Sequence, residues 1–141
     1  SDATKELITL EQEVEYLNSY IELQSYRLEK PDYVRFQLDG EIRKTLIPPL
    51  ILIPFVENAF KHGKKDVSEP GISIHLKVNS EKLVFSISNY LNPVQDSLST
   101  QGDHIGIANA SRRLKLLFPD RHTLKIDQTD DQYFVLLELD L

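Results

Sequence analysis

Four polar side chains follow directly on an apolar segment of the sequence. The segment runs from Leu46 to Val56 and leads into Glu57, Asn58, Lys61 and His62. An asparagine carbonyl is a hard-oxygen ligand of the kind that Mg²⁺ binds, and a lysine ammonium is a point charge for phosphate. These residue types together therefore suit a metal–phosphate site.

The spacing of the four side chains is helical, but it does not by itself indicate a site. Positions i and i+4 share a helix face, so Asn58 lies beneath His62 and Glu57 beneath Lys61. A solvated last turn, with Glu57 and Lys61 as an exposed ion pair worth about 0.3 kcal/mol, explains the same residues. The helix dipole also favours Lys and His at a C-terminus. Taken alone, the stretch favours the solvated turn, and a functional interpretation needs partners elsewhere.

One such partner is the segment GIANASRRL, residues 106–114. Gly106 lies where a long polar segment enters an expected helix, and the free N–H groups of a helix start form an anion site. A single glycine before a helix is weak evidence, since many loops have one. Arg112 and Arg113 could serve phosphate, acidic neighbours or solvent, and solvent is the commonest outcome.

Three helices are expected to carry these residues, over residues 9–30, 48–62 and 105–118. Thr9 and Gln12 form a capping box at the start of the first helix, and Pro31 ends it. Prolines are tolerated in the first turn of the second helix, and Gly63 is a natural C-cap for it.

The first helix carries an apolar seam that alternates spacings of four and three residues, which is a heptad pattern. The seam consists of Leu10, Val14, Leu17, Ile21 and Leu28. It predicts either a helix packed on its own domain or one half of a helical dimer, and the sequence leaves the two alternatives equal.

Alternating segments predict strands over residues 32–39, 71–78, 82–89, 123–126 and 133–141. Residues 90–105 read as a long loop, and loops of this length in compact domains are often functional. The element order predicts an α+β fold, a two-layer α/β sandwich. Its mixed, mostly antiparallel sheet is covered on one face by three helices, with an N-terminal linker helix.

Composition excludes several classes of function. The 141 residues suit one domain, and the net charge of −6 argues against nucleic-acid binding. The chain has no cysteine, which rules out disulfides, a thiol nucleophile and Cys-based metal sites. Its longest apolar run is too short to cross a bilayer. There is no methionine, even at position 1, so we expect a longer parent protein.

Together, three segments resemble the ATP-binding domain of sensor histidine kinases, in the GHKL (Bergerat-fold) superfamily, and more narrowly its LytS/YehU type. LEQEVEYLNSYIELQSYRL (10–28) is similar to the linker helix of that group. IPPLILIPFVENAFKHG (47–63) resembles its N-box, and HIGIANASRRLKLLFP (104–119) its second glycine box. The resemblance covers essentially the whole chain and implies ATP and Mg²⁺ as cofactors.

The N-box resemblance implies roles for the first cluster. Asn58 matches the asparagine that holds Mg²⁺, Lys61 a phosphate-proximal lysine, and His62 a residue that lines the nucleotide pocket. Glu57 matches the acidic residue beside the asparagine. Glu57, Asn58 and Lys61 are thus the expected catalytic residues.

The second glycine box implies the other wall of the site. Gly106 and Asn109 match its glycine and the asparagine that follows. Ile105 and Ile107 are expected to line the same site, and residues 92–105 match the ATP lid.

The sequence departs from the family pattern at three positions. Asn89 stands where the family has an aspartate that binds the adenine amino group, and an asparagine carbonyl can accept the same hydrogen bond. Leu91 stands at a glycine position, where a backbone that needs a positive φ would be strained. His104 replaces the first glycine of the second box and could crowd or contact the phosphates. These departures leave normal ATP affinity open.

The resemblance implies a linker or dimerisation-type helix over residues 1–30 and a catalytic domain over 31–141. The γ-phosphoryl group of Mg-ATP would pass to a histidine on an upstream helix and then to a response regulator. None of the four histidines lies on the first helix, so the chain alone is expected to be inactive. We expect a cytoplasmic domain of a homodimeric inner-membrane protein, attached to the membrane only through upstream segments.

Two alternatives stay open beside this interpretation. The first is a degenerate domain that docks partners and binds nucleotide weakly or not at all, which the departures at Asn89, Leu91 and His104 favour. The second is a kinase of serine residues with the same fold, against which the heptad-like first helix and the N-box argue. Hydrolytic members of the superfamily carry a glutamate where this chain has Pro54, so efficient ATP hydrolysis is not expected.

Overall fold

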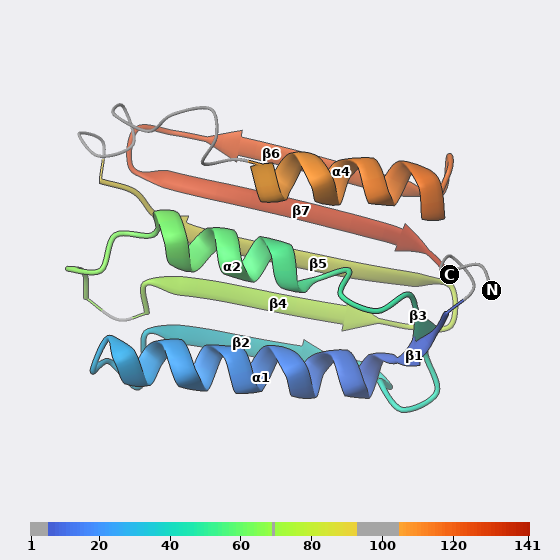
Figure 1. Cartoon of the computed structure of the whole chain (residues 1–141), viewed down its shortest axis with the longest axis horizontal. Coiled ribbons are helices and arrows are strands. Elements are labelled where there is room, and N and C mark those ends of the chain that lie inside the picture. Colours follow the sequence, from blue (N-terminus) through green and yellow to red (C-terminus); the bar gives the residue numbers. More distant parts are fainter. Residues whose placement is uncertain (1–5, 69, 93–104) are drawn as a thin grey trace.

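The computed structural model describes residues 6–68, 70–92 and 105–141, in which three helices cover one face of a mixed five-stranded sheet (Figure 1). A second sheet of two short strands lies beside it. The elements in chain order are β1 (Ile8–Thr9), α1 (Leu10–Arg27), β2 (Val34–Asp39), β3 (Leu46–Ile47), α2 (Ile53–His62), β4 (Ile72–Val78), β5 (Lys82–Tyr90), α4 (Ile105–Leu117), β6 (His122–Gln128) and β7 (Gln132–Asp140).

The large sheet has the strand order β2-β4-β5-β7-β6. β2 runs parallel to β4, and the other neighbouring pairs are antiparallel. Side chains on β4, β5 and β7 alternate between buried and more exposed positions, as expected for a sheet with one covered face. The α+β, two-layer architecture predicted from the sequence is confirmed.

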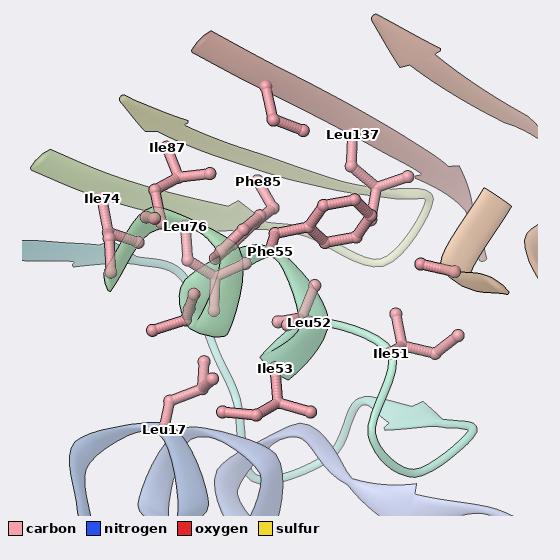
Figure 2. Close-up of a cluster of buried hydrophobic side chains, with 14 of the residues drawn as sticks. Leu17, Ile51, Leu52, Ile53, Phe55, Ile74, Leu76, Phe85, Ile87 and Leu137 are labelled. Atoms are coloured by element: carbon pink, nitrogen blue, oxygen red, sulfur yellow. The ribbon is translucent and has the colours of Figure 1, made fainter. Parts of the chain in front are cut away.

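The core lies between the sheet and the helices, and α2 is at its centre (Figure 2). Phe55 of α2 packs against Phe85 of β5, with ring centroids 6.4 Å apart. On the other side of α2, Ile53 faces Leu17 of α1 (Figure 2). The apolar side chains of α2 are therefore divided between the sheet and its neighbouring helix.

The first helix begins where the capping box predicts. The backbone N–H of Gln12 donates to Thr9 Oγ1 over 3.2 Å, and Thr9 N–H donates to Gln12 Oε1 over 3.1 Å. The helix ends at Arg27, before the predicted boundary at Pro31. Glu29 takes a positive φ of 57°, which turns the chain out of the helix before the proline is reached.

The apolar seam of α1 packs within its own domain, which is the first of the two alternatives that the sequence left open. Leu10, Val14 and Leu17 are buried in the common core, while Ile21 and Leu28 are half-buried against it.

The described part of the chain contains no helix long and apolar enough to span a bilayer.

The predicted start of the second helix is wrong by about one turn. α2 begins at Ile53, whereas the prolines at 48 and 49 belong to a turn before it. Leu50 has a φ of 60°, which the right-handed helix does not allow, so the helix cannot include it. Gly63 is the C-cap as expected, but its φ of −67° is not left-handed.

Candidate functional site

The C-terminus of α2 and the end of β5 meet at one end of the sheet, whereas α4 begins farther along the strands, beside α2 (Figure 1). The backbone N–H of Lys64 donates to the Tyr90 carbonyl over 2.8 Å, which fixes the end of α2 to the end of β5. A Cβ placed on Gly63 would lie 3.5 Å from the Cβ of Asn89. The N-box residues and Asn89 are thus neighbours.

Asn58 is the buried polar residue of α2. It is only 8% exposed, yet its side-chain amide makes no hydrogen bond to another described residue. The amide is not sealed in the core either, since Ser25 carries the only fully enclosed, unpaired side-chain atom in the described ranges. A buried amide normally pairs with protein or solvent. Asn58 therefore offers a carbonyl oxygen and an amino group to a ligand.

The remaining residues of the polar cluster lie on the same helix. Glu57 and Lys61 are exposed and His62 is half-buried, all within α2. The expected ion pair between Glu57 and Lys61 does not form. Such a pair between two exposed side chains gains little and costs side-chain entropy. The charge of Glu57 acts instead on Tyr20 of α1, whose pKa is raised first by burial and second by this carboxylate.

The two departures at the end of β5 are accommodated without strain. Asn89 is buried on the covered face of the sheet, where its Nδ2 donates to the Tyr90 carbonyl over 3.0 Å. Leu91 is buried in the core, and its N–H donates to the Asp131 carbonyl over 2.8 Å. The φ of Leu91 is not positive, so the strain expected at this position is absent. The Leu91 side chain fills space in the core.

The start of α4 is open to solvent. Ile105, Gly106 and Asn109 are exposed, while Ile107 packs into the core. A Cβ placed on Gly106 would meet no atom within 4 Å, so no described residue explains this glycine by packing. Asn109 Oδ1 accepts a hydrogen bond from Arg112 Nη2 over 3.0 Å.

A hollow of about 230 Å³ lies between α4 and α2 with the turn before it. Glu57 lies on its α2 side, and Gly106 and Asn109 lie on its α4 side. Asn58, Lys61, His62 and Asn89 are not among the residues that line this hollow. A larger hollow of about 860 Å³ lies beside the C-terminal half of α1, and none of the predicted site residues lines it.

Two residues that the sequence analysis missed hold the end of α2. Lys65 Nζ donates to the Gly63 carbonyl over 2.7 Å and also to the Phe60 carbonyl, and burial lowers the pKa of Lys65. Tyr33, just before β2, donates from its hydroxyl to the Lys64 carbonyl over 2.8 Å. Burial raises the pKa of Tyr33 to about 12. No sequence signal links Tyr33 to Lys64, because 31 positions separate them.

The described residues do not include His104 or most of the expected lid, since residues 93–104 lie outside them. The described residues hold no cluster of three or more His, Asp or Glu side chains that could bind a metal. A divalent ion at Asn58 would thus take its other ligands from substrate and water, as Mg²⁺ commonly does.

Comparison with known proteins confirms the resemblance to sensor histidine kinases. The chain is 26% identical over 129 residues to the sensor histidine kinase BtsS of Escherichia coli, covering 91% of this chain and 23% of BtsS. It is 29% identical over 126 residues to the sensor histidine kinase YesM of Bacillus subtilis, covering 86% of this chain and 22% of YesM. The chain thus spans about a quarter of the length of these curated relatives. No protein-family model matches it.

Solved structures show the same fold. Acinetobacter baumannii histidine kinase AdeS superposes with a TM-score of 0.61 at 14% identity, covering 96% of this chain and 66% of AdeS. The catalytic domain of histidine kinase ThkA, in a nucleotide-free form, also gives a TM-score of 0.61, at 13% identity. That match covers 96% of this chain and 94% of the ThkA domain. The fold is that of a histidine kinase catalytic domain.

Proposed function

We propose that this chain is the catalytic ATP-binding domain of a two-component sensor histidine kinase. The observation that carries the proposal is the buried, unpaired amide of Asn58, on a helix whose end meets Asn89. Gly106, which no described neighbour explains, lies across the hollow from the same helix. The names of the relatives and the fold support the same assignment.

The residues present fit a magnesium nucleotide. Asn58 would supply a carbonyl oxygen to Mg²⁺, and the Lys61 ammonium would face phosphate. Asn89 uses its amino group on the Tyr90 carbonyl, which leaves Oδ1 as the acceptor for the adenine amino group. The N–H groups at the start of α4 would receive phosphate oxygens. His62, Ile105 and Asn109 would complete the lining of the nucleotide site among the described residues.

The chemistry asked of these residues is positioning and charge neutralisation, which dominate phosphoryl transfer. Bound Mg²⁺ would neutralise charge on the phosphates. Lys61 would stabilise the charge of the transferred group, and Glu57 would border the site. The acceptor is an imidazole nitrogen on an upstream helix, so no water has to be activated. Pro54 borders the hollow where hydrolytic relatives have a glutamate, and it cannot act as a base.

The partners follow from this chemistry. The phosphorylated histidine would pass its phosphoryl group to an aspartate of a response regulator. We expect a homodimer in the parent protein, attached to the membrane through upstream segments.

The test is a calorimetric titration of the chain with a non-hydrolysable ATP analogue, with and without Mg²⁺. Binding should require Mg²⁺ and fall at least about tenfold in Asn58→Ala, because a metal ligand is lost. Glu15→Gln is the control, since Glu15 is exposed on α1 and remote from the site. A folded protein that binds no analogue at millimolar concentration would refute the proposal and leave the degenerate docking domain.

A further inference from the structure

Glu13 is a buried acid for which the proposed function has no use. It lies on α1 and is 1% exposed. Its Oε1 accepts a hydrogen bond from Leu50 N–H over 2.9 Å, and its Oε2 accepts one from Leu52 N–H over 3.0 Å. A buried carboxyl group is costly unless its oxygens are paired, and here both are paired with backbone N–H groups. One side chain of α1 thus holds the turn that precedes α2.

That turn contains a residue in an unusual conformation. Leu50 has a φ of 60°, which is a rare and strained conformation for a bulky residue and persists only where neighbours hold it. Its N–H is held by Glu13 of α1. Its carbonyl accepts a hydrogen bond from Arg113 Nη1 of α4 over 3.0 Å. Both backbone polar groups of a single residue are therefore bonded to side chains of two different helices.

Arg113, which connects α4 to Leu50, also borders the candidate site. Arg113 and Leu50 both line the 230 Å³ hollow between α2 and α4, together with Gly106 and Asn109. Gly106 lies seven residues before Arg113, which is two helical turns along the same helix. A displacement of Arg113 would therefore move the helix start that is expected to receive phosphate.

We propose that Glu13 is a positioning residue for the nucleotide site, acting through Leu50 and Arg113 to fix α4 relative to α1. The assignment of a nucleotide to the site rests on the proposed function, whereas the mechanical link between α1 and α4 does not. The position of α4 would then depend on the position of α1, because both helices bond to the Leu50 turn. A displacement of α1 would change the affinity of the site, and bound nucleotide would resist that displacement.

The discriminating variant is Glu13→Gln, which keeps the size of the side chain. It replaces one acceptor oxygen by an NH₂ donor, so that Leu50 or Leu52 N–H faces a donor. Glu15→Gln makes the same chemical change at an exposed position of the same helix. Arg113→Gln breaks the link from the other side and covers the outcome in which Glu13→Gln does not fold.

The first measurement is hydrogen–deuterium exchange of the nucleotide-free protein. Glu13→Gln should speed exchange of the amides of residues 109–113 at least about fivefold relative to Glu15→Gln. Exchange within β4 and β5 should stay unchanged, which separates the link from a general loss of stability. Arg113→Gln should in turn speed exchange at Leu50 and Leu52. Unchanged exchange in α4 with Glu13→Gln, or at Leu50 and Leu52 with Arg113→Gln, would overturn the proposal.

The second measurement is the affinity of folded variants for the Mg²⁺–ATP analogue. Glu13→Gln should weaken binding about fivefold, and the double variant with Arg113→Gln should be no weaker than the weaker single variant. If the fold-losses of affinity in the two single variants multiply in the double variant, Glu13 and Arg113 act independently, which would contradict the proposal. An unchanged affinity with Glu13→Gln would also contradict it. If the wild type binds no nucleotide, the proposed function fails, while the exchange result still decides whether Glu13 controls α4.

Discussion

At the scale of single residues, two glycines near the candidate site have different physical explanations. A Cβ on Gly63 would lie 2.5 Å from the Ala59 carbonyl oxygen and 3.0 Å from the Tyr33 hydroxyl oxygen. A Cβ on Gly106 would meet no described atom within 4 Å. Gly63 is thus required for packing, and a larger residue at Gly106 is opposed by no described neighbour.

Gly63→Ala should therefore lower the free energy of unfolding by about 1–3 kcal/mol, since backbone and a bonded hydroxyl must move to admit the methyl group. Gly106→Ala should leave stability unchanged or raise it by up to about 1 kcal/mol, because alanine favours a helix. Urea denaturation of both variants measures the difference. Equal losses of stability would contradict the packing explanation.

Tyr33 gives a prediction that depends on pH. Its hydroxyl is buried and donates to the Lys64 carbonyl, and its pKa is raised to about 12 from 10.0. As the pH rises, Tyr33 therefore ionises in the unfolded chain before it ionises in the folded protein. The contribution of Tyr33 to stability is complete below pH 10 and declines as the pH rises towards 12. Ultraviolet titration should show Tyr33 ionising late, beside Tyr20, whose pKa is also raised.

Tyr33→Phe is the control for that titration. The variant should lose the contribution of Tyr33 to the late ionisation, while that of Tyr20 remains. Its stability should fall by about 1 kcal/mol at neutral pH because the hydrogen bond is gone. Lys65 remains in both proteins, so its lowered pKa cancels in the comparison. A wild type and a variant with the same alkaline titration would refute the assignment.

The sequence predicted the local features at this scale and missed the remote ones. The capping box of Thr9 and Gln12 involves residues three positions apart, and it formed as expected. Glu13 bonds to Leu50 and Leu52, 37 and 39 positions away, and no local pattern could indicate that. For the same reason the sequence assigned no role to Tyr33. The roles of Asn58 and Lys61 stay predictions until nucleotide is bound.

At the scale of elements, α1 is the helix whose role the sequence left open. Its seam packs against α2 and the core, while Tyr16, Leu23 and Tyr26 remain largely exposed. The heptad spacing alone could not decide this, because a seam that packs on its own domain and one that packs on a second chain have the same pattern.

Leu17→Ala should destabilise the chain by about 2–5 kcal/mol, because Leu17 is 0% exposed and its truncation leaves a cavity between α1 and α2. Leu23→Ala, at a position that is 50% exposed, should change stability by less than about 0.5 kcal/mol. Urea denaturation with sedimentation analysis is the measurement. If Leu17→Ala dissociated a dimer and left the stability of the monomer intact, the seam would instead be an interface between chains.

The boundaries of α2 illustrate what local rules cannot supply. Prolines at 48 and 49 are compatible with a first helical turn, which predicted a start near them. The positive φ of Leu50 forbids it, and that conformation is held by Glu13 and Arg113 from other helices. The strands of the five-stranded sheet, by contrast, were predicted to within about two residues, because alternation of side chains is a local property. The two-residue strands β1 and β3 are too short to alternate and were not predicted.

At the scale of the whole molecule, the two faces of the sheet differ. The helices cover one face, and the candidate site lies among them around α2, whose end meets β5 and whose side faces α4 (Figure 1). The opposite face carries polar side chains such as His75, whose Nε2 lies 2.6 Å from Asp39 Oδ2. A nucleotide at the candidate site should therefore affect only one end of the helical layer.

The most direct test of the account is amide chemical-shift mapping of the ¹⁵N-labelled chain with a Mg²⁺–ATP analogue. The account predicts the largest changes in residues 58–64, 89–92 and 105–110, with little change on the polar face around His75. Asn58→Ala should reduce these changes at the same nucleotide concentration, and Glu15→Gln should not. Large changes confined to another surface, such as the hollow beside the end of α1, would contradict the assignment of the site.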